Sequence, residues 1–456
     1  MKGLLFERSI KLLRIKVALI SLGCAKNTVD SENMLGILKR EHFQVTGEAT
    51  EADVIIVNTC GFISAAKEES IDTILEMARL KTQGRCKKLV VAGCLVQKYR
   101  EDLLREIPEI DAVLGTGDIG SVAETVRQSM QGSRVVNVRP PGQEDFTGII
   151  PRFRTTSVPT AYLKIAEGCD HRCSYCTIPE MRGPYRSRPA EALLGEAASL
   201  IADGAKELVV VAQDTTLYGL DRYQKKKLPF LLEELAQLEG LQWIRLLYMY
   251  PEHINQEMIQ VVAEEPRICK YLDIPLQHAS NVILRRMNRR QNKEEILKLV
   301  TGLRESIPDI TLRTTFIVGF PGETEEHFQE LLGFVEEAQF DWVGVFKYSR
   351  EEGTPAARMR GQVPEEVKEE RFHRVMLLQR EISRKRNLLW LNRIIPVMAE
   401  GYSTEHPGML VGRAERHAPE IDGVVRFTGK QVLPGELVMV RITGVDYYDL
   451  VGEIVA

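Results

Sequence analysis

Long apolar runs are missing from this sequence. Across its 456 residues no uninterrupted apolar stretch approaches the roughly 18–20 residues that are needed to cross a bilayer. Residues 1–20 carry a charge every few positions and lack the apolar core and small-residue cleavage site of a signal peptide. We therefore expect a cytoplasmic protein that keeps its N-terminus and has no membrane partner.

A basic excess is also missing. The chain has 60 Lys and Arg against 64 Asp and Glu, a net charge of −4, so the whole chain does not indicate a broad electrostatic grip on nucleic acid. Hydrophobic residues make up 44% and charged residues 27%, which is typical of globular proteins. A chain of this length predicts about two to four domains.

Cysteines are few, but their placement is informative. In a long cytoplasmic chain they indicate metal ligands or catalytic groups more often than disulfides. The eight are Cys24, Cys60, Cys86, Cys94, Cys169, Cys173, Cys176 and Cys269.

The order of apolar runs and turns predicts an α/β protein with three domains. Residues 14–138 alternate apolar runs with helical patterns, which predicts an open parallel sheet with crossover helices. After a Pro- and Gly-rich linker, residues 155–387 repeat the alternation with six candidate strands. These fit a partial (β/α)6 barrel better than a second open sheet, although the pattern barely separates the two. Residues 389–456 show short β-rich runs and predict a small antiparallel β-barrel.

Three cysteines follow the first strand of the second region in a C-x3-C-x2-C spacing: Cys169, Cys173 and Cys176. Thiolates are soft ligands for zinc or iron–sulfur clusters. A structural zinc site is normally closed by a fourth ligand, and the short loop hardly lets His171 join the same metal. Three thiolates on a four-iron cluster leave one iron open, as a substrate-binding cluster requires. A zinc loop or a chance cluster is the alternative.

A second set of cysteines is scattered in sequence but equivalent in position. Cys24, Cys60 and Cys94 each end a predicted strand, and the carboxyl ends of parallel strands line one edge of a sheet. We therefore expect the three to converge. Three buried structural cysteines are the alternative, because free Cys packs well in cores. A glycine adjoins each cysteine and would let the backbone approach a bulky cluster: Gly23, Gly61 and Gly93.

Both sets lie in motifs of one family. The loop EGCDHRCSYC, with Tyr175 before its last cysteine, resembles the radical S-adenosylmethionine superfamily. The motifs SLGCAKNTVDSE and NTCGFISAAKEES resemble the N-terminal domain of methylthiotransferases, and the C-terminal barrel is similar to a TRAM domain. The resemblance covers essentially the whole chain. It implies two 4Fe-4S clusters, one on Cys24, Cys60 and Cys94, and one with S-adenosylmethionine on Cys169, Cys173 and Cys176.

The resemblance also implies a reaction. One S-adenosylmethionine methylates a sulfur at the first cluster, a second yields a 5′-deoxyadenosyl radical that abstracts hydrogen from the substrate, and the methylthio group couples there. The segments AQDTTLYGLD and YLDIPLQHAS look closer to the branch that modifies the β carbon of an aspartate in small-subunit ribosomal protein S-twelve. The alternative branch modifies an adenosine in transfer RNA. An electron donor and a sulfur donor are implied partners.

The charge of the C-terminal segment agrees with a protein substrate. Residues 389–456 hold six Lys and Arg and nine Asp and Glu, a net charge of −3. A barrel that grips RNA phosphates should be basic, whereas an acidic one suits a basic ribosomal protein. The rival from another class is a non-catalytic iron–sulfur or zinc protein that binds nucleic acid, which would need neither the open iron nor the second cysteine set.

Other residues give weaker signals. Tyr175, Gln213 and Asp214 are expected near S-adenosylmethionine, as are Gly319 and Gly322, whose backbone would approach the adenosyl group; a plain turn is nearly as well supported.

The remaining polar and thiol groups have structural alternatives. The arginines of MRGPYRSRP would pair with a carboxylate of cofactor or substrate, or form a solvated face. Gln277 and His278 follow a strand, where a structural histidine is favoured. Cys86 and Cys269 are expected to be ordinary thiols.

Overall fold

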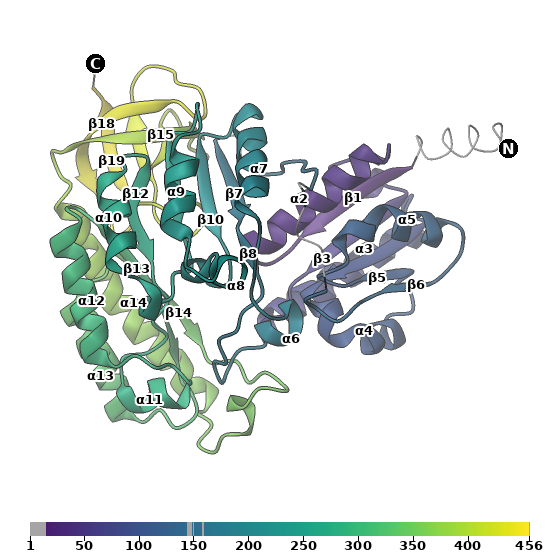
Figure 1. Cartoon of the computed structure of the whole chain (residues 1–456), viewed down its shortest axis with the longest axis horizontal. Coiled ribbons are helices and arrows are strands. Elements are labelled where there is room, and N and C mark those ends of the chain that lie inside the picture. Colours follow the sequence, from purple (N-terminus) through teal and green to yellow (C-terminus); the bar gives the residue numbers. More distant parts are fainter. Residues whose placement is uncertain (1–14, 144–147, 149, 157–158, 456) are drawn as a thin grey trace.

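The computed structural model describes residues 15–143, 148, 150–156 and 159–455, and Figure 1 shows their arrangement. The expectation that the N-terminus carries no cleaved signal rests mainly on residues 1–14, which lie outside the described residues. No helix in the described ranges is long and apolar enough to span a membrane.

The N-terminal domain is an open parallel sheet with the strand order β2-β1-β3-β4-β5-β6. The strand Val54–Thr59 is buried along its whole length and alternates between two cores, so helices cover both faces of the sheet. The strands are β1 (Lys16–Ser21), β2 (Gln44–Val45), β3 (Val54–Thr59), β4 (Lys88–Gly93), β5 (Ala112–Leu114) and β6 (Val135–Asn137). The helices are α2 (Ala25–Arg40), α3 (Ser64–Gln83), α4 (Cys94–Glu106) and α5 (Val122–Met130).

The central domain is a second parallel sheet, and its order β14-β13-β12-β11-β10-β7 is that of a six-stranded partial barrel. The strands are β7 (Thr160–Lys164), β10 (Glu207–Val211), β11 (Trp243–Leu246), β12 (Ile268–Asp273), β13 (Thr311–Val318) and β14 (Trp342–Lys347), with a short hairpin of β8 (Ala166–Glu167) and β9 (Arg186–Ser187). The helices are α6 (Ile178–Arg182), α7 (Ala190–Ala202), α8 (Leu220–Tyr223), α9 (Leu228–Ala236), α10 (Gln256–Glu264), α11 (Asn281–Arg286), α12 (Lys293–Ser306), α13 (Glu325–Ala338) and α14 (Glu365–Leu388).

The two faces of the central sheet have different coverings. Alternate strand residues pack outward against the crossover helices in the largest core of the molecule. Their neighbours point inward, where Tyr162 and Tyr271 share a core with Val29 of α2 and with Met398 and Ala418 of the C-terminal barrel. The N- and C-terminal domains therefore both cover the inner face.

The C-terminal domain is a closed five-stranded barrel in the order β15-β16-β17-β19-β18. The prediction of a small barrel is confirmed, with one difference: β17 and β19 pair in parallel, because the chain returns across the barrel between them. The strands are β15 (Ile394–Tyr402), β16 (Leu410–Ala414), β17 (Val425–Thr428), β18 (Leu437–Val445) and β19 (Leu450–Ile454).

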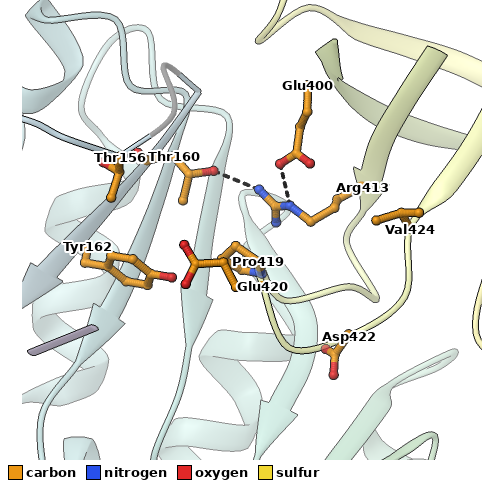
Figure 2. A pocket seen from close by; sticks show the side chains of 9 residues that line it. All are labelled: Thr156, Thr160, Tyr162, Glu400, Arg413, Pro419, Glu420, Asp422 and Val424. Carbon is orange, nitrogen blue, oxygen red and sulfur yellow. Dashed lines mark hydrogen bonds and ion pairs between the residues drawn. The ribbon is translucent and has the colours of Figure 1, made fainter. Parts of the chain in front are cut away.

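Buried charge fixes this barrel to the amino ends of the central strands. Glu207, at the start of β10, accepts hydrogen bonds from Arg413 at 2.5 Å and from Arg245 at 2.7 Å. Figure 2 shows Arg413 reaching Thr160 and Glu400 beside a cavity of about 360 Å³. The opposite, carboxyl ends of the strands are thereby left for the cysteine loop.

Replacing Glu207 by Gln should destabilise the fold. The change leaves the buried guanidinium of Arg245 without a carboxylate partner and that of Arg413 with Glu400 alone, at a cost of about 3–5 kcal/mol in the free energy of unfolding. Burial opposes ionisation of Glu207, but Arg413 and Arg245 outweigh it and lower its pKa from 4.5 to about 2. Its contribution is therefore complete above pH 4.5 and is lost as the pH falls through about 2.

Urea unfolding of the metal-free chain measures this difference. The difference in the free energy of unfolding between wild type and Glu207→Gln should be largest near pH 7 and shrink below pH 4.5. The control is Glu233→Gln, at an exposed position on α9, which should change the free energy of unfolding by less than about 0.5 kcal/mol. Equal stability of wild type and Glu207→Gln at pH 7 would show that the ion pairs do not hold the barrel.

Candidate functional site

The first cysteine set converges at the carboxyl edge of the N-terminal sheet. Cys24 immediately precedes α2, Cys60 follows β3, and Cys94 is the first residue of α4. A Cβ on Gly23 would lie 3.1 Å from the Cys60 Sγ, and one on Gly61 would lie 3.1 Å from the Cys94 carbonyl carbon. The adjoining glycines are therefore needed for the cysteine-bearing loops to pack together, before any cluster is considered.

Polar side chains that the sequence did not single out hold these loops. Asn27 donates to the carbonyls of Leu22 at 2.7 Å and Thr59 at 3.2 Å, which ties α2 to the neighbouring strand end. The Cys60 amide donates to Ser70 Oγ at 3.1 Å, and the Ser70 hydroxyl donates back to the Cys60 carbonyl at 3.0 Å. Asn27 lies three residues after Cys24 and Ser70 ten residues after Cys60, and no spacing in the sequence singles them out.

Two cations lie beside the first cysteine set and favour the thiolate of Cys24. Cys24 is exposed to solvent, yet the protein around its sulfur still opposes ionisation of the thiol. The positive charges of Lys26 and Arg182 outweigh this effect, so the pKa of Cys24 is lowered. Burial raises the pKa of Cys94 to about 11, with Arg182 opposing the rise. Cys24 and Cys94 also lie at helix N-termini, where backbone dipoles favour negative charge.

The second set lies in the loop between β8 and α6, which backbone hydrogen bonds fasten at several points. The Cys169 amide donates to the Gly183 carbonyl at 3.1 Å, and the Cys176 amide donates to Cys173 at 3.1 Å. Ser174, between the last two cysteines, donates to the Met287 carbonyl at 3.0 Å. The loop is therefore held in place by the protein alone. Burial raises the pKa of Cys169 to about 12, and the neighbouring Cys173 adds to the rise.

Gln213 and Asp214 contact the cysteine loop and its flank. Gln213 donates to Glu167 at 2.7 Å, two residues before Cys169. The fully buried Asp214 binds the His171 Nε2 at 2.7 Å, and the His171 ring stacks on Tyr250 at 3.7 Å between centroids. Both predicted residues therefore position the loop, while their contact with S-adenosylmethionine stays a prediction.

The aromatic side of the loop holds His253, whose place nothing in the sequence indicates. His171, Asp214 and His253 offer ligand atoms within 4.8 Å of one another, although they come from separate segments. Tyr175 packs edge-on against Phe320, with ring centroids 6.4 Å apart, beside the turn that contains the two predicted glycines. The predicted role of Tyr175 at the cofactor is compatible with this place and stays a prediction.

Gly319 and Gly322 have positive φ angles of +72° and +85°. A Cβ on Gly319 would lie 2.2 Å from Lys368 Cγ of α14, and one on Gly322 would lie 2.8 Å from Cζ of Arg286. The positive φ angles and the neighbouring side chains are enough to require glycine at both positions, as the alternative of a plain turn predicts. An approach of this backbone to the adenosyl group stays a prediction.

The arginines after the loop do not form a solvated face. Arg182 and Arg188 are buried and ion-paired, Arg188 with Glu196 at 2.6 Å, and Arg186 is half-buried and donates to the Pro184 carbonyl. The carboxylates that pair with Arg182 and Arg188 are side chains of this protein and not groups of a cofactor or substrate. His278 is fully buried and accepts from the Ser280 amide, as a structural histidine does.

The other two cysteines lie in cores away from both sets. Cys86 is buried within the N-terminal core and donates to the Lys88 carbonyl at 3.3 Å, and Cys269 is buried on the inner face of the central sheet. Both behave as ordinary buried thiols.

The donor sets fit iron–sulfur clusters. Each site gathers three cysteines, the first set beside the buried guanidinium of Arg182, which donates to Cys94 Sγ at 3.3 Å. Three soft thiolates with a hydrogen-bond donor on one sulfur are the surroundings such clusters prefer.

Comparisons with known proteins agree with this geometry. Models of the "Uncharacterized protein family UPF0004", the "Radical SAM superfamily" and the "TRAM domain" match residues 16–115, 163–335 and 393–455. A relative from Pelotomaculum thermopropionicum named "Ribosomal protein uS12 methylthiotransferase RimO" is 55% identical over 97% of this chain and 99% of its own length. The chain belongs to the ribosomal protein uS12 methylthiotransferase family. A Geobacter sulfurreducens relative of the same name is 52% identical, again over 97% and 99%.

Solved structures share the fold of this family member. The radical S-adenosylmethionine methyltransferase TsrM from Kitasatospora setae, with cobalamin and a [4Fe-4S] cluster bound, aligns with a TM-score of 0.57 at 16% identity, over 75% of this chain and 74% of its own. The cobalamin-dependent S-adenosylmethionine radical enzyme OxsB aligns at 0.50 and 12% identity, over 82% and 57%. The family predicted from the cysteine motifs, with its ribosomal-protein branch, is confirmed.

Gly319→Ala tests how tightly the turn beside the loop is built. The positive φ and the contact with Lys368 should lower the free energy of unfolding by about 1–3 kcal/mol. Gly302→Ala, in open space on α12, should raise it by about 0.5–1 kcal/mol. Urea unfolding of both variants makes the comparison, and equal effects would contradict the strained turn.

Proposed function

We propose that this chain adds a methylthio group to the β carbon of an aspartate in ribosomal protein uS12, the small-subunit protein S-twelve. The observation that carries the proposal is the presence of two separate three-cysteine sites in a chain that is 55% identical to a uS12 methylthiotransferase over nearly its full length. A non-catalytic iron–sulfur or zinc protein would need only one such site.

The proposal assigns a group to each site. Cys24, Cys60 and Cys94 would hold an auxiliary 4Fe-4S cluster. Cys169, Cys173 and Cys176 would hold a second cluster whose open iron binds S-adenosylmethionine. When bound, these groups supply electron transfer, a methyl group and activation of an unreactive C–H bond.

The protein's own residues hold the loops and exclude water. Asp214 and Tyr250 orient His171 in the second loop, and Glu167 and Gln213 fix its start. The inner face of the central sheet is closed at its amino end by residues 415–422 of the C-terminal barrel, since Arg245 donates to the Glu415 carbonyl and Tyr271 donates to Asp422. A substrate would therefore approach the cysteine loops from the carboxyl end.

The surface charge of the C-terminal barrel suits a basic protein. Two of its six cations, Arg413 and Arg416, are buried and ion-paired with Glu207 and Asp341 of the central domain. Fewer cations therefore remain to bind phosphates than the sequence count implies. This supports uS12 over transfer RNA as the substrate.

The remaining assignments complete the proposal. The functional units would be residues 14–138 with the auxiliary cluster, 155–387 with S-adenosylmethionine, and 389–456 for substrate recognition. The reaction would take place in the cytoplasm, beside ribosomes, and would draw on an electron donor and a sulfur donor.

Mass spectrometry of uS12 and of transfer RNA from cells that lack this chain tests the substrate. The uS12 peptide should lose a methylthio group, and expression of the wild-type chain should restore it. Transfer RNA from the same cells should keep its modifications. A methylthio group lost from transfer RNA and retained on uS12 would instead support the adenosine branch.

Alanine substitutions should separate the two cysteine sets. Replacing Cys169, Cys173 and Cys176 should abolish 5′-deoxyadenosine formation and remove about four irons. Replacing Cys24, Cys60 and Cys94 should also remove about four irons, yet leave 5′-deoxyadenosine formation in place while methylthio insertion stops. Anaerobic iron and sulfide analysis and product chromatography measure these outcomes.

Cys86→Ala and Cys269→Ala are the matched controls, since both thiols lie outside the two sites. They should keep about eight irons, four for each cluster. A wild-type chain that holds zinc, or a triple variant that keeps all its iron, would overturn the cluster assignment.

A further inference from the structure

Arg182 lies between the two cysteine sites. It is the last residue of α6, the short helix that begins two residues after Cys176. This helix packs on α4, whose first residue is Cys94, and Figure 1 shows it between the N-terminal and central sheets. A single turn of helix therefore joins the second cysteine loop to the first cysteine set.

The side chain of Arg182 is only 2% exposed, and its guanidinium is held from several sides. Its Nε donates to Cys94 Sγ at 3.3 Å. One terminal nitrogen donates to Asp30 at 2.5 Å and to Glu167 at 3.1 Å, and the other donates to Asn27 at 2.9 Å. Because the group is planar, these acceptors fix the direction of the N–H bond that points at the sulfur.

The same segment contacts the second cysteine loop. Glu167, which binds Arg182, precedes Cys169 by two residues and also accepts from Gln213. The carbonyl of Gly183, the residue after Arg182, accepts from the Cys169 amide at 3.1 Å. A continuous series of short contacts therefore runs from Cys94 to Cys169.

The local charges explain why Arg182 can act on the sulfur. Lys164 is bound to both Asp30 and Glu167, so two cations and two carboxylates balance within the buried cluster. The balance lets Arg182 stay charged in a dry interface. Its Nε–H is directed at Cys94.

We propose that Arg182 is a positioning residue that sets the reduction potential of the auxiliary cluster and holds it against the radical-cluster loop. The inference rests on the proposed function, because it takes Cys94 as a ligand of that cluster. A hydrogen bond and a positive charge at a ligand sulfur stabilise the reduced, more negative cluster, so they raise its potential. Nothing in the cysteine spacing alone assigns this role.

Potentiometric titration followed by electron paramagnetic resonance tests the inference. The full chain with Cys169, Cys173 and Cys176 replaced by Ala isolates the auxiliary cluster, and the chain with Cys24, Cys60 and Cys94 replaced isolates the radical cluster. Arg182→Gln should shift the auxiliary midpoint to lower potential and leave the radical midpoint in place. Arg182→Lys, which keeps the charge but loses the fork, should give a smaller shift.

Turnover of the otherwise unaltered chain gives a second readout. Arg182→Gln should slow methylthio insertion about 10- to 100-fold while 5′-deoxyadenosine formation changes little. Arg188→Gln is the matched control, because Arg188 is equally buried but bound to Glu196 and the Lys164 carbonyl. It should leave both midpoints unchanged.

Each outcome decides the inference. Loss of the auxiliary cluster alone in Arg182→Gln, with Arg182→Lys retaining it at a lower potential, supports it. Unchanged midpoints, or equal shifts in both clusters, would overturn it and leave Arg182 a structural residue. A wild-type chain with only about four irons would instead refute the proposed function, and the two failures are thus distinguishable.

Discussion

The arrangement of the whole molecule depends on a buried set of ion pairs between the N-terminal and central domains. Asp30 of α2 binds Lys164 of β7 and Arg182 of α6, and Glu167 binds the same two cations. All four side chains are nearly inaccessible to solvent. Removing any one would leave an uncompensated buried charge, so the network permits only a narrow range of domain orientations. That orientation brings the edge with Cys94 to the loop that follows Cys176.

A second constraint acts at the other end of the central sheet. There the C-terminal barrel is held by Glu207 and by the segment that reaches the inner face through Tyr271 and Trp342. The amino ends of the strands are therefore closed, and the carboxyl ends are the side at which both cysteine sites lie. The contacts that hold the barrel and the cysteine sites therefore lie at opposite ends of the same sheet, as stabilising and catalytic residues do in other α/β barrels.

The sequence predicted those parts of the structure that have a local signature. Alternating apolar runs predicted both parallel sheets, and a cysteine at each of three strand ends predicted the meeting of Cys24, Cys60 and Cys94. Contacts between segments far apart in the sequence could not be predicted from such patterns. Asp30 and Arg182 are 152 residues apart, and no periodicity connects them. For the same reason the sequence favours Arg182 as a partner of a cofactor or substrate carboxylate, or as a solvated residue, and gives no sign that it is buried at a cysteine sulfur.

The clusters that we propose for the two sites would lie on either side of this interface. Electron paramagnetic resonance of the fully reduced chain tests this arrangement most directly, because two paramagnetic clusters linked by the short contacts from Cys94 through Arg182 to Cys169 must interact. We expect a wild-type spectrum broadened by spin coupling, and simple unbroadened spectra when either cysteine set is replaced by Ala. A wild-type spectrum equal to the sum of the two variant spectra would contradict it.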